Sequence, residues 1–74
     1  MKKINDELYQ YKGIDVKKLS NGMYKARFYV NTTSGFCTVS GSTQASFKKL
    51  FNEFVKNNKG LDMKRYKEMK SLMR

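Results

Sequence analysis

The chain has 74 residues, of which 16 are Lys or Arg and 6 are Asp or Glu, so its formal net charge is +10. This length allows one small domain, and a hydrophobic content of 39% with five Phe and five Tyr argues against a chain kept disordered by its charge. The absence of His and the single Cys exclude most catalytic, metal and disulfide sites, so we expect no enzyme and no cofactor, and a polyanion as partner.

Residues 1–12 precede the first clear strand pattern. Ile4, Leu8 and Tyr11 have helical spacing, so we expect either a short helix or an extended N-terminal arm. The segment becomes acidic at Asp6-Glu7, where a secretory signal would become apolar, and no run of about eighteen apolar residues occurs in the chain. These features predict a cytoplasmic protein with no membrane partner.

Residues 13–31 predict a β-hairpin. Apolar and polar residues alternate over residues 13–17, and Ser20-Asn21-Gly22 follows. Asn-Gly is a strong hairpin signal because both residues tolerate positive φ at low cost. The second strand covers residues 23–31, and a polar loop then leads to a third strand at residues 36–40.

The strongest periodicity lies between Thr43, a good N-cap, and Gly60, a good C-cap. Five apolar residues recur there at helical spacing: Phe47, Leu50, Phe51, Phe54 and Val55. We expect this stripe to pack on the apolar face of the sheet. Residues 61–74 have the composition of a second helix that is basic.

The predicted fold class is therefore α+β, with a three-stranded antiparallel sheet packed on one amphipathic helix and a second helix at the C-terminus. Three segments follow from this prediction: an N-terminal arm or short helix at residues 1–12, a sheet-plus-helix domain at residues 13–59, and a basic C-terminal helix at residues 61–74.

The strand at residues 23–31 has one apolar and one basic face, because side chains alternate along a strand. Lys and Arg bind phosphates or guanine edges, Tyr stacks on bases, and hydroxyl groups bind the backbone. Nine residues are therefore candidates for nucleic-acid contact: Lys17, Lys25, Arg27, Tyr29, Asn31, Thr38, Ser40, Lys64 and Arg65. The alternative is that these residues are an ordinary solvated face of a half-buried sheet. The net charge favours nucleic-acid contact.

Two local sequences, Ser20-Asn21-Gly22-Met23-Tyr24-Lys25-Ala26-Arg27-Phe28 and Gly41-Ser42-Thr43-Gln44-Ala45, occur in the order hairpin, strand, helix. Together they resemble the three-stranded, one-helix DNA-binding domains found at the N-terminus of phage-type tyrosine recombinases (the arm-type integrase domain) and in the AP2 proteins of plants. The resemblance covers about residues 13–58. Ser42 departs from the family pattern, in which an aromatic residue usually precedes the capping Thr.

The resemblance implies a sheet that lies in the major groove of duplex DNA. The residues that it directs at the bases are Lys17, Lys25, Arg27, Tyr29, Thr38 and Ser40. Since the chain lacks a recombinase catalytic domain, the resemblance also implies a free-standing binder.

Three functions are compatible with these patterns. The first is a small DNA-binding regulator or accessory protein of a phage or mobile element. The second is a phage-type inhibitor or adaptor whose basic surface binds an acidic surface of a host protein. The third is an RNA-binding protein in which Tyr29 stacks on unpaired bases. The sequence leaves the oligomeric state and the recognised DNA site open.

Overall fold

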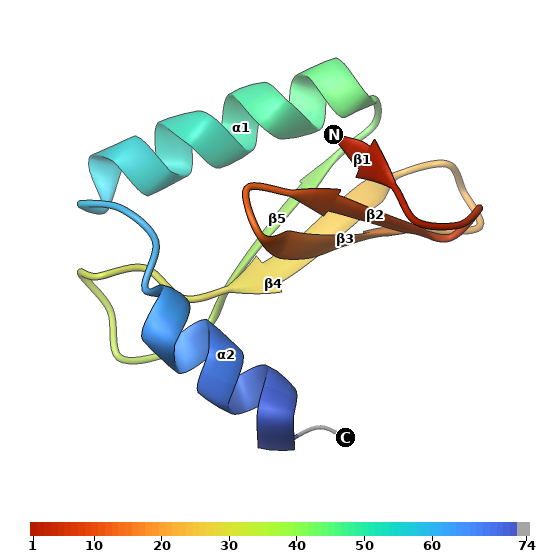
Figure 1. Ribbon diagram of the computed structural model, residues 1–74. Coiled ribbons are helices and arrows are strands. Elements are labelled where there is room, and N and C mark those ends of the chain that lie inside the picture. Colours follow the sequence, from red (N-terminus) through yellow and green to blue (C-terminus); the bar gives the residue numbers. More distant parts are fainter. Residues whose placement is uncertain (73–74) are drawn as a thin grey trace.

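The computed structural model describes residues 1–72 and has one five-stranded antiparallel sheet and two helices (Figure 1). The elements are β1 (Lys2–Lys3), β2 (Leu8–Tyr11), β3 (Ile14–Lys18), β4 (Tyr24–Phe28), β5 (Cys37–Gly41), α1 (Gln44–Asn57) and α2 (Met63–Leu72). The strands lie in the sheet in chain order. The α+β class matches the prediction, but the predicted three-stranded sheet is wrong.

The two additional strands come from residues 1–12, which form neither an arm nor a short helix. Asn5 shapes the turn between β1 and β2, because its Oδ1 accepts hydrogen bonds from two following backbone N–H groups, each at 2.9 Å. In β2, Tyr9 is buried and Tyr11 is half-buried on the same face, as strand alternation requires. The spacing of Leu8 and Tyr11 suggested a helix, but these residues form a strand, because the backbone N–H and C=O groups of β2 find their hydrogen-bond partners in β3.

The hairpin predicted from Ser20-Asn21-Gly22 is confirmed as β3 and β4. Asn21 Oδ1 accepts a hydrogen bond from the Met23 N–H at 3.1 Å, and Gly22 has a φ of +86°, which glycine adopts without strain. The third predicted strand is present as β5 and pairs with β4 along its whole length. Strands β3, β4 and β5 therefore form a regular meander, and β3 is the central strand of the five-stranded sheet.

Helix α1 covers one face of the sheet, which we call the inner face (Figure 1). Thr43 caps the helix as predicted, since its Oγ1 accepts a hydrogen bond from a first-turn N–H at 3.0 Å. Phe47 and Phe51 are fully buried, and the Phe51 ring centroid lies 4.9 Å from that of Phe28 on β4. Leu50, expected in the buried stripe, is 47% exposed, so the helix contacts the sheet through a narrower stripe than predicted.

Helix α2 lies on the other side of the sheet from α1, near the end of β4 (Figure 1). Tyr66 anchors it, because the buried Tyr66 Oη accepts a hydrogen bond from the Asp15 N–H at 2.9 Å. The Lys70 Nζ lies 2.9 Å from the Asp15 carboxylate. Asp15 points away from α1, so α2 reaches one end of the opposite face, which we call the outer face. Neither helix, within residues 1–72, is long and apolar enough to span a bilayer.

At Gly41 the backbone of α1 lies in close contact with β5. A Cβ atom at this position would lie 2.6 Å from the Phe47 backbone nitrogen and 2.8 Å from its Cα. We expect Gly41→Ala to lower the free energy of unfolding by about 1–3 kcal/mol, as overpacking of a core typically does. Urea denaturation measures this change.

Gly35→Ala is the matched control, because a Cβ atom there has no atom within 4 Å. It should unfold at nearly the same urea concentration as the wild type. Equal stability of the Gly41→Ala and Gly35→Ala proteins would contradict the close contact between α1 and β5.

Candidate nucleic-acid interface

The outer face of the sheet gathers several of the predicted contact residues into two rows. The first row crosses four strands through directly paired residues: Leu8, Lys17, Lys25 and Ser40. The second row contains Arg27 of β4 and its partner Thr38 of β5. The cations and hydroxyl residues of both rows are exposed. We call Lys17, Lys25, Arg27, Thr38 and Ser40 the basic rows.

Lys17 and Lys25 occupy an electrostatically unfavourable position. They are direct cross-strand partners on the same face, and like charges in that arrangement destabilise a sheet. The salt bridges of residues 1–72 are elsewhere, in the pairs Lys3–Asp6, Asp62–Arg65 and Asp15–Lys70. The cations of the basic rows therefore form no salt bridge with a carboxylate in the described part of the chain.

Arg27 is oriented by an aromatic residue. Its guanidinium carbon lies 4.4 Å from the ring centroid of Phe36, which is 50% exposed in the loop before β5. A guanidinium has five N–H donors, and a contact with an aromatic ring uses the charge of the group and not an acceptor. In residues 1–72 the Arg27 side chain donates no hydrogen bond, so these donors are open to an acceptor outside the protein.

Arg65 and Tyr29 lie together at the junction of α2 with the loop after β4. The Arg65 guanidinium lies 5.0 Å from the Tyr29 ring centroid. Its Nε donates to Asp62 at 2.7 Å, and its Nη2 donates to the carbonyl oxygens of Val30, at 3.0 Å, and Thr33. Both side chains are half-buried. These contacts stabilise the fold. Because Arg65 occupies one side of the Tyr29 ring, a base cannot stack on that side.

Asn31 and Lys64 are the remaining predicted residues, and neither belongs to the basic rows. Asn31 Nδ2 donates to the Lys59 carbonyl at 2.8 Å, and its N–H donates to the Gly60 carbonyl at 3.1 Å. Asn31 therefore holds the turn between α1 and α2. Lys64 is exposed on α2.

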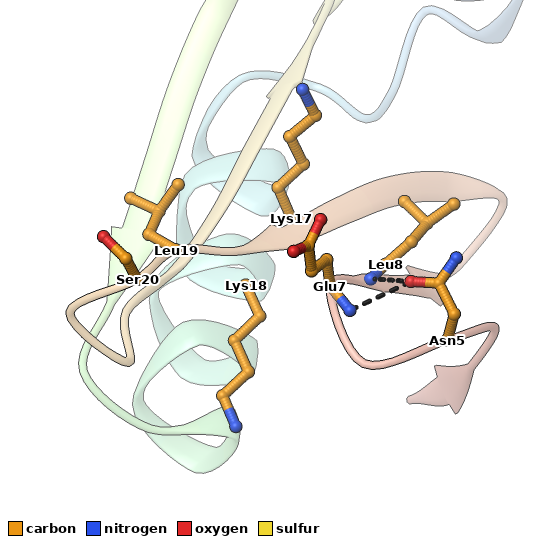
Figure 2. A pocket seen from close by; sticks show the side chains of 7 residues that line it. All are labelled: Asn5, Glu7, Leu8, Lys17, Lys18, Leu19 and Ser20. Atoms are coloured by element: carbon orange, nitrogen blue, oxygen red, sulfur yellow. Dashed lines mark hydrogen bonds between the residues drawn. The ribbon is translucent and has the colours of Figure 1, made fainter.

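A shallow hollow of about 400 Å³ lies where β2 begins and β3 ends (Figure 2). Its lining mixes charges and apolar groups: Asn5, Glu7, Leu8, Lys17, Lys18, Leu19 and Ser20. Lys17 and Lys18 leave β3 in opposite directions, so their ammonium groups do not converge in the hollow (Figure 2). A small-molecule site needs convergent polar groups in an apolar pocket, and this hollow does not have them.

Two features of the interface were missed from the sequence. Phe36 was not among the candidates, because only the conformation of the loop before β5 brings its ring beside Arg27. The contact of Lys70 with Asp15 joins residues from opposite ends of the chain, and no local pattern indicates it. Lys17 was predicted to share a face with Lys25, and its direct pairing with Lys25 comes from a three-residue loop of Ser20, Asn21 and Gly22, which is closed by a hydrogen bond from the Leu19 N–H to the Met23 carbonyl at 2.8 Å.

No family model matches the chain, and no curated protein or solved structure is significantly similar to it. Among residues 1–72, no three Asp, Glu or Cys side chains gather as metal ligands would. The interface is therefore assigned from its own geometry and charge.

The Asp62–Arg65 pair, which lies where α2 meets the loop after β4, should make stability depend on pH. Hydrogen bonds from the Arg65 side chain first, and from its backbone N–H second, lower the pKa of Asp62 below its ordinary value. The ionised carboxylate therefore stabilises the fold at all pH values above the unfolded pKa of about 3.9, and this contribution is lost as pH falls through the lower folded pKa. We expect Asp62→Asn to reduce the free energy of unfolding at neutral pH and to approach the wild type in acid.

Urea denaturation of the wild-type and Asp62→Asn proteins from neutral to acidic pH measures this difference. Asp6→Asn is the control, because the Asp6 side chain is 96% exposed and its pair with Lys3 should contribute little. A loss of stability in Asp62→Asn that is the same at every pH would contradict the role of the ionised pair.

Proposed function

We propose that the protein binds double-stranded DNA through the outer face of β3, β4 and β5. The observation that carries this proposal is the direct pairing of Lys17 with Lys25 in the centre of an exposed face, where neither lysine forms a salt bridge within residues 1–72. A phosphate backbone removes the repulsion between the two lysines and releases its own counterions on binding.

The side chains around the two lysines suit a duplex. Arg27 lies beside the Phe36 ring and has N–H donors that fit a phosphate or the paired acceptors of guanine. On β5, the hydroxyl residues Thr38 and Ser40 are the direct partners of Arg27 and Lys25 on β4. Lys17, Lys25 and Arg27 leave β3 and β4 on the same side of the sheet, and β2 and β5 flank these two strands.

The resemblance of residues 13–58 to arm-type integrase and AP2 domains supports the same mode of docking. In those domains the outward residues of the sheet face the bases. The resemblance also suggests the biological role, as a regulator or accessory protein of a phage or mobile element. The structure adds β1 and β2 to the three strands of that pattern, so Lys17 lies in the central strand rather than at an edge.

A salt titration with matched variants tests the proposal. Fluorescence anisotropy gives the affinity for a labelled duplex at several salt concentrations, and the slope of log K against log salt falls by about 0.9 for each phosphate neutralised. We expect the Lys17→Gln/Lys25→Gln protein to bind more weakly and with a slope shallower by about 2.

The control is Lys49→Gln/Lys56→Gln, which removes the same charge from exposed positions on α1. It should keep the wild-type slope to within about half a unit. Equal effects of the two double variants would contradict docking through the outer face. Weak binding to duplex by the wild-type protein would also contradict it, and tighter binding to single-stranded RNA or to an acidic protein would then identify the other class of partner.

A further inference from the structure

We propose that a second phosphate-binding surface lies on the α1 side of the molecule, and that with the outer face it lets one protein hold two duplex segments. This surface, which we call the Tyr11 cluster, consists of Tyr11, Lys12, Lys48 and Asn52. Tyr11 and Lys12 come from the end of β2 and its turn, and Lys48 and Asn52 come from α1. The inference rests on the proposed binding of duplex DNA.

The cluster is held by hydrogen bonds and by the Tyr11 ring. The Nζ atoms of Lys12 and Lys48 lie 5.5 and 5.9 Å from the ring centroid of Tyr11. Lys12 Nζ donates to Asn52 Oδ1 at 2.7 Å, and Asn52 Nδ2 donates to Tyr11 Oη at 2.9 Å. An ammonium group has three N–H donors, so Lys12 keeps two for a ligand after its bond to Asn52. Two cations are thus positioned around one ring with donors available.

Positive charge at the cluster lacks a carboxylate partner. In the described part of the chain, no salt bridge includes Lys12 or Lys48, and Glu53, exposed on the same helix, pairs with neither. The amino group of Met1 is also close. Its pKa is lowered, first by partial desolvation and second by the positive charge of Lys48. Like charges are crowded here, and a phosphate group would relieve their repulsion.

The Tyr11 cluster and the basic rows face opposite directions. Tyr11 pairs with the buried Ile14, and its ring contacts Phe47 and Phe51 of α1, so it lies on the inner side of the sheet. Lys17 and Lys25 point to the outer side. The sheet separates the two surfaces, so a straight duplex on the outer face does not reach the cluster. The occupant that matches the charge of the cluster is therefore a second duplex segment.

A capture assay tests this bridging. One duplex is immobilised, a second labelled duplex is added in solution, and its retention is measured as protein is titrated. The affinity for a single labelled duplex is measured in parallel by anisotropy. The wild-type protein should retain the second duplex. The Lys12→Gln/Lys48→Gln protein should retain about tenfold less, as the loss of two phosphate contacts implies, and should keep its single-duplex affinity to within about threefold.

Lys49→Gln/Lys56→Gln, which removes equal charge from α1, should capture like the wild type. Single-duplex binding without capture by the wild type would overturn the second surface and leave the proposed function intact. Undiminished capture by Lys12→Gln/Lys48→Gln would also overturn it, since bridging would then come from other residues or from association of two proteins. Loss of single-duplex affinity in that variant would place the two lysines in the first interface and overturn the inference as well. Absence of duplex binding by the wild type would instead reject the proposed function.

Discussion

Packing of aromatic rings between the sheet and α1 is the interaction on which the rest of the structure depends. The ring centroids of Phe28 on β4 and Phe51 lie 4.9 Å apart, and Phe51 stacks on Phe47 with ring centroids 5.7 Å apart. All three side chains are fully buried. In a chain this short, these rings supply a large share of the apolar area removed from water, which is the main favourable term in folding. The inner face of the sheet is therefore committed to the core.

Burial of the inner face determines which side of the sheet carries the positive charge. Because side chains alternate along a strand, the residues between the buried ones must face outward, and in β3 and β4 several of these are cations. The pairing of Lys17 with Lys25 reduces the stability of the sheet, and no carboxylate in residues 1–72 compensates for it by a salt bridge. A sheet whose outer face served only as a solvated surface would gain stability from an oppositely charged pair at this position. The arrangement favours a polyanionic partner.

Much of the fold follows from local sequence, and the exceptions have physical causes. The Asn21-Gly22 turn, the Thr43 cap and the Phe47/Phe51 stripe were predictable because each depends on neighbours in the chain. Strands β1 and β2 were not, because their pattern is short and only pairing with β3 distinguishes them from a helix. At the site, alternation along β3, β4 and β5 predicted the basic rows. The roles of Arg65 and Tyr29 depend on α2 meeting the loop after β4, which tertiary packing alone decides.

NMR titration of isotope-labelled protein with duplex DNA tests the central claim most directly, because it reports on each residue without substitution. At substoichiometric duplex, the signals of β3, β4 and β5, including the side-chain Nε–H of Arg27, should shift first. The Arg65 Nε–H signal should move less, because that group is already bonded to Asp62. First shifts confined to α1 and β1, with Lys17, Lys25 and Arg27 unchanged, would contradict the outer face as the DNA-binding surface.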